Sequence, residues 1–257
     1  QRQMCIRDSL DGSSMYGSES KFSPFWAVGL GWNIHHEKFM ENTGISRLKI
    51  RGSIGTTGKA SFQPYQSQTM FEYIQDGWYA TGIGATLMAL GNPNLKWETN
   101  LNFNVGIDFS LFNNRFSGSF DFFTRRSKDL LYSRPIAPSL GYGSIDENVG
   151  ALKNTGIEMV LNGTIINQNG WVWKLGMNLT HYKNKVTDLP LKDMPRSGVN
   201  KLQVGRSVYD FYMIEWAGID PENGDPLWYK DEVDANKNPT GKRVTTNDYG
   251  SADYYYV

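Results

Sequence analysis

Two short stretches of the sequence carry residue types that could bind a metal ion. His35, His36 and Glu37 are adjacent potential ligands. Neighbours on an extended chain point apart, and no third ligand is evident, so a solvated turn is favoured. The run from Asp234 to Asn238 begins like a calcium loop, but Pro239 stands where the sharp-turn glycine belongs and the closing glutamate is missing. The sequence therefore predicts no metal site.

Catalysis and cofactor binding lack support as well. Gly52, Gly55 and Gly58 are not followed by the helical pattern that a dinucleotide fingerprint needs. The only cysteine, Cys5, leaves no disulfide framework, metal–thiolate site or cysteine nucleophile. No recognisable motif surrounds a Ser-His-Asp series or a pair of carboxylates that could act in catalysis. We therefore expect no enzymatic activity and no cofactor.

The composition limits the class of protein. The 257 residues include 26 basic and 26 acidic side chains, so no net charge attracts nucleic acid. The mean hydropathy is −0.49, and no run approaches the roughly 18 apolar residues of a membrane helix. That pattern leaves a membrane β-barrel open, because half of each barrel strand faces water. Aromatic residues at 14% and 27 glycines suit a β-rich chain with many turns.

The stretch from Leu95 to Leu111 shows the clearest periodicity. Every odd position except Thr99 is apolar, and no even position is. Side chains on a strand alternate between two faces, so the stretch is predicted to be one strand with an apolar and a polar face. Globular strands usually run about 5–6 residues, whereas a strand that crosses an outer membrane needs roughly 9–11. The length therefore favours a membrane strand.

A tight hairpin is predicted at Asn113-Asn114, since asparagine tolerates positive φ. A two-residue turn would place Leu111 opposite Phe116 and Val105 opposite Phe122. It would also place Asp108 opposite Ser119. Both strands then keep their apolar faces on one side, which supports the register because a one-residue slip would invert one face.

The chain predicts about eight or nine strands, all up-and-down neighbours. Further strands are expected at 25–34, 47–55, 150–166, 171–180, 207–219, from 227 and 248–257. Gly170 is expected to supply a bulge that keeps the apolar residues of the strands at 150–166 and 171–180 on one face. Connections alternate between shorter ones, at 35–46, 113–114, 167–170 and 220–225, and longer ones, at 56–93, 126–148, 183–205 and 231–247. Outer-membrane barrels have short periplasmic turns and long extracellular loops. The fold expected is all-β, a partial antiparallel up-and-down transmembrane β-barrel.

This fold predicts where side chains point. Residues expected to line the lumen are Asn100, Asn102, Asn104, Asp108, Asp121, Arg125, Glu158 and Asn162. Residues expected to contact lipid are Leu101, Phe103, Val105, Ile107, Phe109, Phe120, Phe122, Met159, Leu161 and Leu175, and the odd face as a whole extends back to Leu95. Tyr73, Trp78 and Tyr79, in a long connection, could stack on sugar rings, or could simply pack their loop.

A soluble alternative also alternates along its strands. A β-sandwich or lipocalin-like barrel that binds glycans outside the cell would show the same period. Strand length, the sorting of the connections and tryptophans near strand ends, such as Trp26 and Trp171, favour the membrane barrel.

The ends of the chain suggest a fragment. Residues 1–9 lack an apolar signal-peptide core and look like a translated adapter, so we expect a non-native leader. The chain ends at Val257, inside an aromatic strand-like run. Residues 10–257 are therefore expected to be an incomplete barrel domain.

The run from Gly91 to Tyr132 closely resembles the C-terminal barrel region of SusC/RagA-type TonB-dependent transporters of Bacteroidetes. Its most specific part is Asn92–Glu98, NPNLKWE. The resemblance spans nearly everything from Asp11 onward. Other matching pieces follow in order: Asp11–Ser14, Gly31-Trp32, Arg51–Ser53, Gly55–Gly58, Asn148–Gly150, Asn154–Glu158, Ala217–Asp220 and Asn223–Pro226.

The resemblance implies a 22-stranded barrel in the cell outer membrane, with an N-terminal plug and a TonB box that this chain lacks. It implies import of oligosaccharides, or in some members peptides, driven by TonB-ExbB-ExbD. The implied partners are a SusD-like surface lipoprotein and outer-membrane lipid, and no nucleic acid. A siderophore or cobalamin receptor is the alternative within TonB-dependent transporters, weakened by the motif match.

Overall fold

The structure is a computed structural model. It describes residues 2–16, 20–41, 43–60, 67–79, 82–137, 139, 141, 143–191, 193–234 and 237–257, with the backbone alone at 75–79 and 193–197. The chain divides into two compact units, unit 1 at 1–190 and unit 2 at 191–257. Among the described residues, no helix has the length and hydropathy needed to cross a bilayer.

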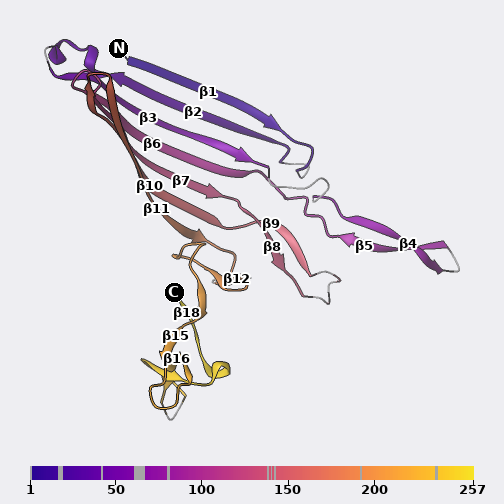
Figure 1. Ribbon diagram of the computed structural model, residues 1–257. Coiled ribbons are helices and arrows are strands. Elements are labelled where there is room, and N and C mark those ends of the chain that lie inside the picture. Colours follow the sequence, from indigo (N-terminus) through magenta and orange to yellow (C-terminus); the bar gives the residue numbers. More distant parts are fainter. Residues whose placement is uncertain are drawn as a thin grey trace. The chain divides into compact units, whose positions relative to one another are not determined.

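Unit 1 is built on one antiparallel sheet of seven strands that lie side by side (Figure 1). They are, in spatial order, β1 (Arg2–Gly12), β2 (Phe22–Asn33), β3 (Ile45–Lys59), β6 (Glu98–Leu111), β7 (Phe116–Lys128), β10 (Ala151–Gln168) and β11 (Trp171–Asp188). The shortest has 11 residues and the longest 18. These lengths meet the roughly 9–11 residues that a membrane-crossing strand requires. The predicted leader is part of β1, which pairs with β2 along its whole length.

The connections within this sheet are sorted as predicted (Figure 1). At one end lie the turns at 112–115 and 169–170 and the link between β2 and β3, which holds two 3-10 turns, η1 (Ile34–His36) and η2 (Lys38–Met40). At the other end, called here the long-loop end, each long connection contains a hairpin of its own. These hairpins are β4 (Met70–Tyr79) with β5 (Gly82–Ala89), and β8 (Leu131–Pro135) with β9 (Ser144–Asn148).

The β6–β7 hairpin has the predicted register. Leu111 pairs with Phe116, Val105 with Phe122 and Asp108 with Ser119. The φ values of Asn113 and Asn114 are 53° and 65°, as a type I′ turn requires. The Arg115 N–H closes the turn by donating to the Phe112 carbonyl at 3.1 Å. Two asparagines therefore fix the register of the central hairpin.

In the β10–β11 hairpin, the bulge that keeps the apolar residues of both strands on one face lies at a different residue from the one predicted. Gly170 lies in the turn, with φ of 80°. The register shift falls instead between Thr164 and Ile166, so Ile165 is the extra residue. Beyond the bulge, Leu161 pairs with Met177 and the apolar residues of both strands share one face. The two-residue turn alone would have set them on opposite faces.

Several predicted strand limits are wrong. Leu95 precedes β6, which begins at Glu98, and its side chain is 0% exposed among loop residues, so it is not on the face of the sheet. The strand predicted to end at 180 continues as β11 to Asp188. The main sheet holds seven strands, fewer than the eight or nine expected, because the later predicted strands belong to unit 2.

Unit 2 consists of small separate sheets in place of long strands. Its elements are β12 (Asp193–Ser197), β13 (Asn200–Gln203), β14 (Tyr212–Ile214), β15 (Trp216–Ile219), β16 (Pro226–Val233), β17 (Pro239–Thr246), η4 (Tyr249–Ser251) and β18 (Tyr254–Tyr256). The predicted strand at 207–219 is broken into β14 and β15, which join different sheets. The predicted strand at 248–257 is a 3-10 turn followed by three strand residues paired with β14.

The main sheet exposes its apolar face. Val105 is 38% exposed and Ile107 39%, whereas Ser110 and Asp121, on the other face, are 4% and 8% exposed. A soluble sandwich would cover its apolar face with a second sheet. The buried cluster described in the chain, Tyr16 and Leu95 with Trp97 and Leu131 packed against them, lies among long-loop residues and does not cover that face. Among its described residues, unit 1 therefore has no second large sheet of the kind that a soluble β-sandwich requires.

Candidate functional site: the polar face of the main sheet

The register assembles the predicted site residues onto two faces. The eight residues predicted to line the lumen share one face, called here the polar face. The ten residues predicted to contact lipid share the opposite, apolar face. Asp121, for example, pairs with Gly106 on β6 and with Glu158 on β10. Which face meets lumen and which meets lipid stays a prediction at this point.

An ion-pair network lies at the middle of the polar face. Arg51 Nε donates to both carboxylate oxygens of Asp108, at 3.2 and 3.3 Å, and Arg51 Nη2 donates to Asp121 Oδ2 at 2.6 Å. The Asp121 side chain is 11% exposed and that of Arg51 35%. One cation thus bridges three strands, β3, β6 and β7, and neutralises two carboxylates in a sheltered position.

Gly106 leaves the space that the bond between Arg51 and Asp121 requires. Arg51, Gly106 and Asp121 are directly opposite one another on three adjacent strands. A Cβ at position 106 would overlap Asp121 Oδ1 and would lie 3.0 Å from Arg51 Cζ. The missing side chain therefore lets the guanidinium pass over β6 to the second carboxylate.

Polar side chains continue the network toward the long-loop end. Arg125 Nε donates to Asn102 Oδ1 at 2.8 Å, and Ser127 Oγ donates to Asn100 Oδ1 at 2.5 Å. Asn102 Nδ2 donates to Thr57 Oγ1 at 3.3 Å. These bonds tie neighbouring strands together through side chains on an accessible part of the polar face.

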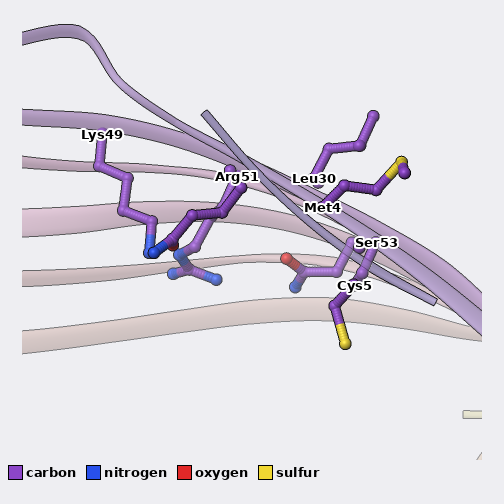
Figure 2. A pocket seen from close by; sticks show the side chains of 11 residues that line it. Met4, Cys5, Leu30, Lys49, Arg51 and Ser53 are labelled. Atoms are coloured by element: carbon purple, nitrogen blue, oxygen red, sulfur yellow. The ribbon is translucent and has the colours of Figure 1, made fainter. Parts of the chain in front are cut away.

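A hollow of about 510 Å³ lies on the sheet beside this network. Figure 2 shows Lys49, Arg51 and Cys5 on one side of the ribbon, with Met4 and Leu30 on the other. Gly29 and Gly31 line the hollow without side chains, and Asn104 completes its polar wall. The hollow offers hydrogen-bond donors and acceptors. Lys49, Arg51 and Ser53 were not predicted as site residues, although cationic and aliphatic residues alternate through 47–55.

The potential metal ligands are arranged differently from the prediction. His35 and His36 do not point apart, because η1 is a tight turn that brings their ring centroids within 4.0 Å. His35 Nδ1 lies 3.0 Å from the Leu48 carbonyl oxygen. Asp234 Oδ1 accepts from the Asn238 N–H at 2.9 Å. Within the described part of the chain, no three His, Cys, Asp or Glu residues are grouped as a metal site would require.

The three candidate sugar-stacking aromatics belong to the β4–β5 hairpin. Tyr73 is 73% exposed and pairs with Ala85 across the hairpin. The side chains of Trp78 and Tyr79 lie outside the described residues, although their backbone is part of β4. Tyr73 is therefore accessible to a ligand, and the structure brings no second described aromatic side chain of this set beside it.

Comparison with known proteins identifies the chain's relatives. It is 32% identical over 225 residues to the TonB-dependent receptor P3 of Formosa agariphila, a match that covers 81% of this chain and 22% of that receptor. It is 29% identical over 238 residues to the TonB-dependent receptor SusC of Bacteroides thetaiotaomicron, covering 84% of this chain and 24% of SusC. The chain thus spans less than a quarter of the length of these two relatives.

A solved structure has the same fold. The RagAB peptide importer in its closed-closed state superposes with a TM-score of 0.87 at 30% identity, covering 100% of this chain and 28% of that chain. The family model described as "TonB dependent receptor-like, beta-barrel" matches residues 7–256. It describes a receptor barrel and no enzyme class. With a family match over almost its whole length, and with the strand register and the separate apolar face described above, the chain belongs to the TonB-dependent receptor-like β-barrel family.

Proposed function

We propose that the chain is a section of the wall of an outer-membrane barrel that imports oligosaccharides or peptides. The observation that carries the proposal is the inverted burial at the centre of the main sheet, on β6 and β7. Its apolar face is exposed, while its polar face holds the sheltered Arg51–Asp121 ion pair. In a barrel, the apolar face contacts lipid and the polar face lines the lumen.

The partners follow from the relatives. SusC and RagAB support a SusD-like surface lipoprotein as a partner, and the family supports energy supplied by TonB-ExbB-ExbD. The relatives also support an outer membrane of Bacteroidetes type as the location. The chain spans 22% of receptor P3, so these activities belong to the full-length protein. In this proposal residues 1–9 are a leader, and residues 10–257 are the barrel section.

The RagAB importer is a peptide importer. An exposed tyrosine such as Tyr73 can pack against a sugar ring as well as against a peptide side chain. Tyr73, Trp78 and Tyr79 are therefore proposed as contacts for either class of substrate. The alternation of cationic and aliphatic residues along β3 is explained by a barrel wall and not by a soluble core.

The orientation of the wall is tested by two neighbouring substitutions in the full-length protein. Val105→Arg puts a charge on the proposed lipid face and is expected to cost about 2–4 kcal/mol near the bilayer midplane. Asn104→Arg puts the same charge on the proposed lumen face and should cost much less. Folding into lipid vesicles, followed by the gel mobility of unheated samples, measures both. Equal effects of the two substitutions would refute this orientation.

Import is tested in a strain that lacks the gene, complemented with the full-length protein. The probes are dye-labelled maltooligosaccharides and dye-labelled casein peptides. The complemented strain should accumulate one of them, and an uncoupler that collapses the proton-motive force should stop accumulation. If the complemented strain accumulates neither probe beyond the deletion strain, the proposed function fails.

A further inference from the structure

A fixed segment at the long-loop end holds the β8–β9 hairpin. The segment Gly91–Glu98, called here the clamp, belongs to no strand up to Trp97, yet it contacts both ends of the hairpin. Asn148, the last residue of β9, receives the Lys96 N–H at 2.8 Å on its Oδ1. Its Nδ2 donates to the Lys96 carbonyl at 2.7 Å. The side-chain amide thus pairs with Lys96 as a neighbouring strand would.

The same amide reaches the start of the hairpin. Asn148 Nδ2 also donates to the Asp129 carbonyl at 2.8 Å, and Lys96 Nζ lies 2.8 Å from Asp129 Oδ1. The carboxylate of Glu98, which is 7% exposed, accepts from the Leu131 N–H at 3.0 Å. Asn92 Nδ2 donates to the Asp146 carbonyl at 2.8 Å. Both strands of the hairpin are therefore fastened to one short segment.

Apolar packing anchors the clamp itself. Leu95 is fully buried against Tyr16, and Leu131 and Trp97 pack on this cluster. The Tyr16 and Trp97 rings stack with centroids 4.5 Å apart. Burial, reinforced by the charge of Glu98, raises the pKa of Tyr16 to about 12. The clamp is thus held by packing against Tyr16 of the β1–β2 connection, and Leu131 is the residue by which the β8–β9 hairpin joins this cluster.

Two residues at the base of the hairpin have a positive φ. Asp129 and Gly150 flank the hairpin, with φ values of 56° and 88°. Glycine and aspartate adopt the left-handed conformation more readily than most residues, so these two positions suit the turns at the base of the hairpin. Because Asp129 is one of the groups that Asn148 binds, loss of the Asn148 amide would remove three of the hydrogen bonds that hold the hairpin at its base.

We infer that the clamp, through Asn148, holds the β8–β9 hairpin in the single position that captures substrate at the entrance of the barrel. This inference rests on the proposed function. A substrate that needs the hairpin in place binds in proportion to the fraction of molecules that have it there. Asn148 is then a positioning residue, which acts on capture and not on the energised step that follows.

The test uses the full-length protein with Asn148→Ala and with Ser133→Ala as the matched control. Ser133 Oγ bonds Ser144 Oγ at 3.0 Å within the hairpin and does not contact the clamp. Amide hydrogen exchange should become about tenfold faster at Lys96 and Leu131 in Asn148→Ala, since a hydrogen bond of typical strength corresponds to about that factor. Exchange within β6 and β7 should not change.

Uptake of the same two dye-labelled probes gives the second readout. The concentration for half-maximal uptake should rise in Asn148→Ala and stay at the parent value in Ser133→Ala, with an unchanged maximal rate and amount of surface protein. Faster exchange with unaltered half-saturation, or unaltered exchange, overturns the inference. If Asn148→Ala fails to reach the membrane, the same measurements are made on Asn148→Asp. That variant keeps the oxygen that accepts from the Lys96 N–H and loses the donations to the Lys96 and Asp129 carbonyls. Failure of that variant to fold would make Asn148 a folding residue and also overturn the inference. Absence of uptake by the unmodified protein would instead defeat the proposed function.

Discussion

Gly106 offers the sharpest test of the polar face, because its replacement should break a specific ion pair without adding charge. In Gly106→Ala the new methyl group would occupy the space of Asp121 Oδ1, with Arg51 Cζ 3.0 Å away. At least one of the two side chains must then shift, and we expect the 2.6 Å contact between Arg51 and Asp121 to be lost. The φ of Gly106 is not in the left-handed region, so alanine itself introduces no backbone strain.

The magnitude follows from the burial of the pair. Breaking a buried ion pair costs about 3–5 kcal/mol, and we expect the lower end because Arg51 is 35% exposed and keeps Asp108 as a partner. Alanine offsets about 0.4–1 kcal/mol of this by restricting the unfolded chain. The net loss in the free energy of unfolding should therefore be about 2 kcal/mol.

Urea unfolding of the full-length protein in lipid vesicles, followed by tryptophan fluorescence, measures this loss. Gly29→Ala is the matched control on the same face, since the nearest atoms to its new methyl group, Gly52 O and Ser53 Cβ, are 4.0 Å away. It should be neutral or slightly stabilising. In an Arg51→Ala/Asp121→Ala background, Gly106→Ala should cost almost nothing. The reasoning is refuted if Gly106→Ala costs the same in both backgrounds, or no more than Gly29→Ala.

Three further predictions concern turns and titrating groups. Asn113→Val should lower the free energy of unfolding by about 1–2 kcal/mol, because a branched residue opposes positive φ, while Asn113→Gly should not; urea midpoints compare them. The Arg134 guanidinium, by hydrogen bonding, holds the pKa of Glu147 below its usual range. The pair's contribution to the β8–β9 hairpin is therefore present above the ordinary glutamate pKa and lost as pH falls through the lowered one. The protection factors of the β8 and β9 amides, which are the intrinsic exchange rate at each pH divided by the observed rate, should fall on acidification, and Glu147→Gln should abolish that fall. Burial and the bond to Asp231 raise the pKa of Tyr255 to about 12, so its contribution to unit 2 should be complete below pH 10 and decline toward pH 12. Ultraviolet titration of Tyr255→Phe against the parent checks this, and a difference signal centred at pH 10 would contradict it.

The main sheet could be predicted from the sequence because its information is local and repetitive. Alternation over many residues fixed the faces of β6 and β7, and two asparagines set their register. The Arg51 network was harder to foresee, since it joins residues 70 positions apart through a glycine that alternation treats as a neutral position. The bulge at Ile165 was misplaced because a glycine marks a turn as readily as a bulge.

In unit 2 and in the clamp, the prediction from periodicity was wrong for a different physical reason. The predicted strand at 207–219 contains Gly218, with φ of 117°, and its two halves bond to different partners. The partner of β14 is β18, which is distant in sequence, so no local pattern indicates that pairing, whereas β15 pairs with β16, the next strand along the chain. Leu95 shows the same effect at a single residue. It continues the alternation of β6, yet it is buried against Tyr16, 79 residues earlier in the sequence. The reason is that the clamp, which contains Leu95, lies outside the sheet up to Trp97. Alternation therefore specifies which face a side chain would occupy in a strand, whereas hydrogen bonding to Asn148 and burial of Leu95 determine where the strand begins.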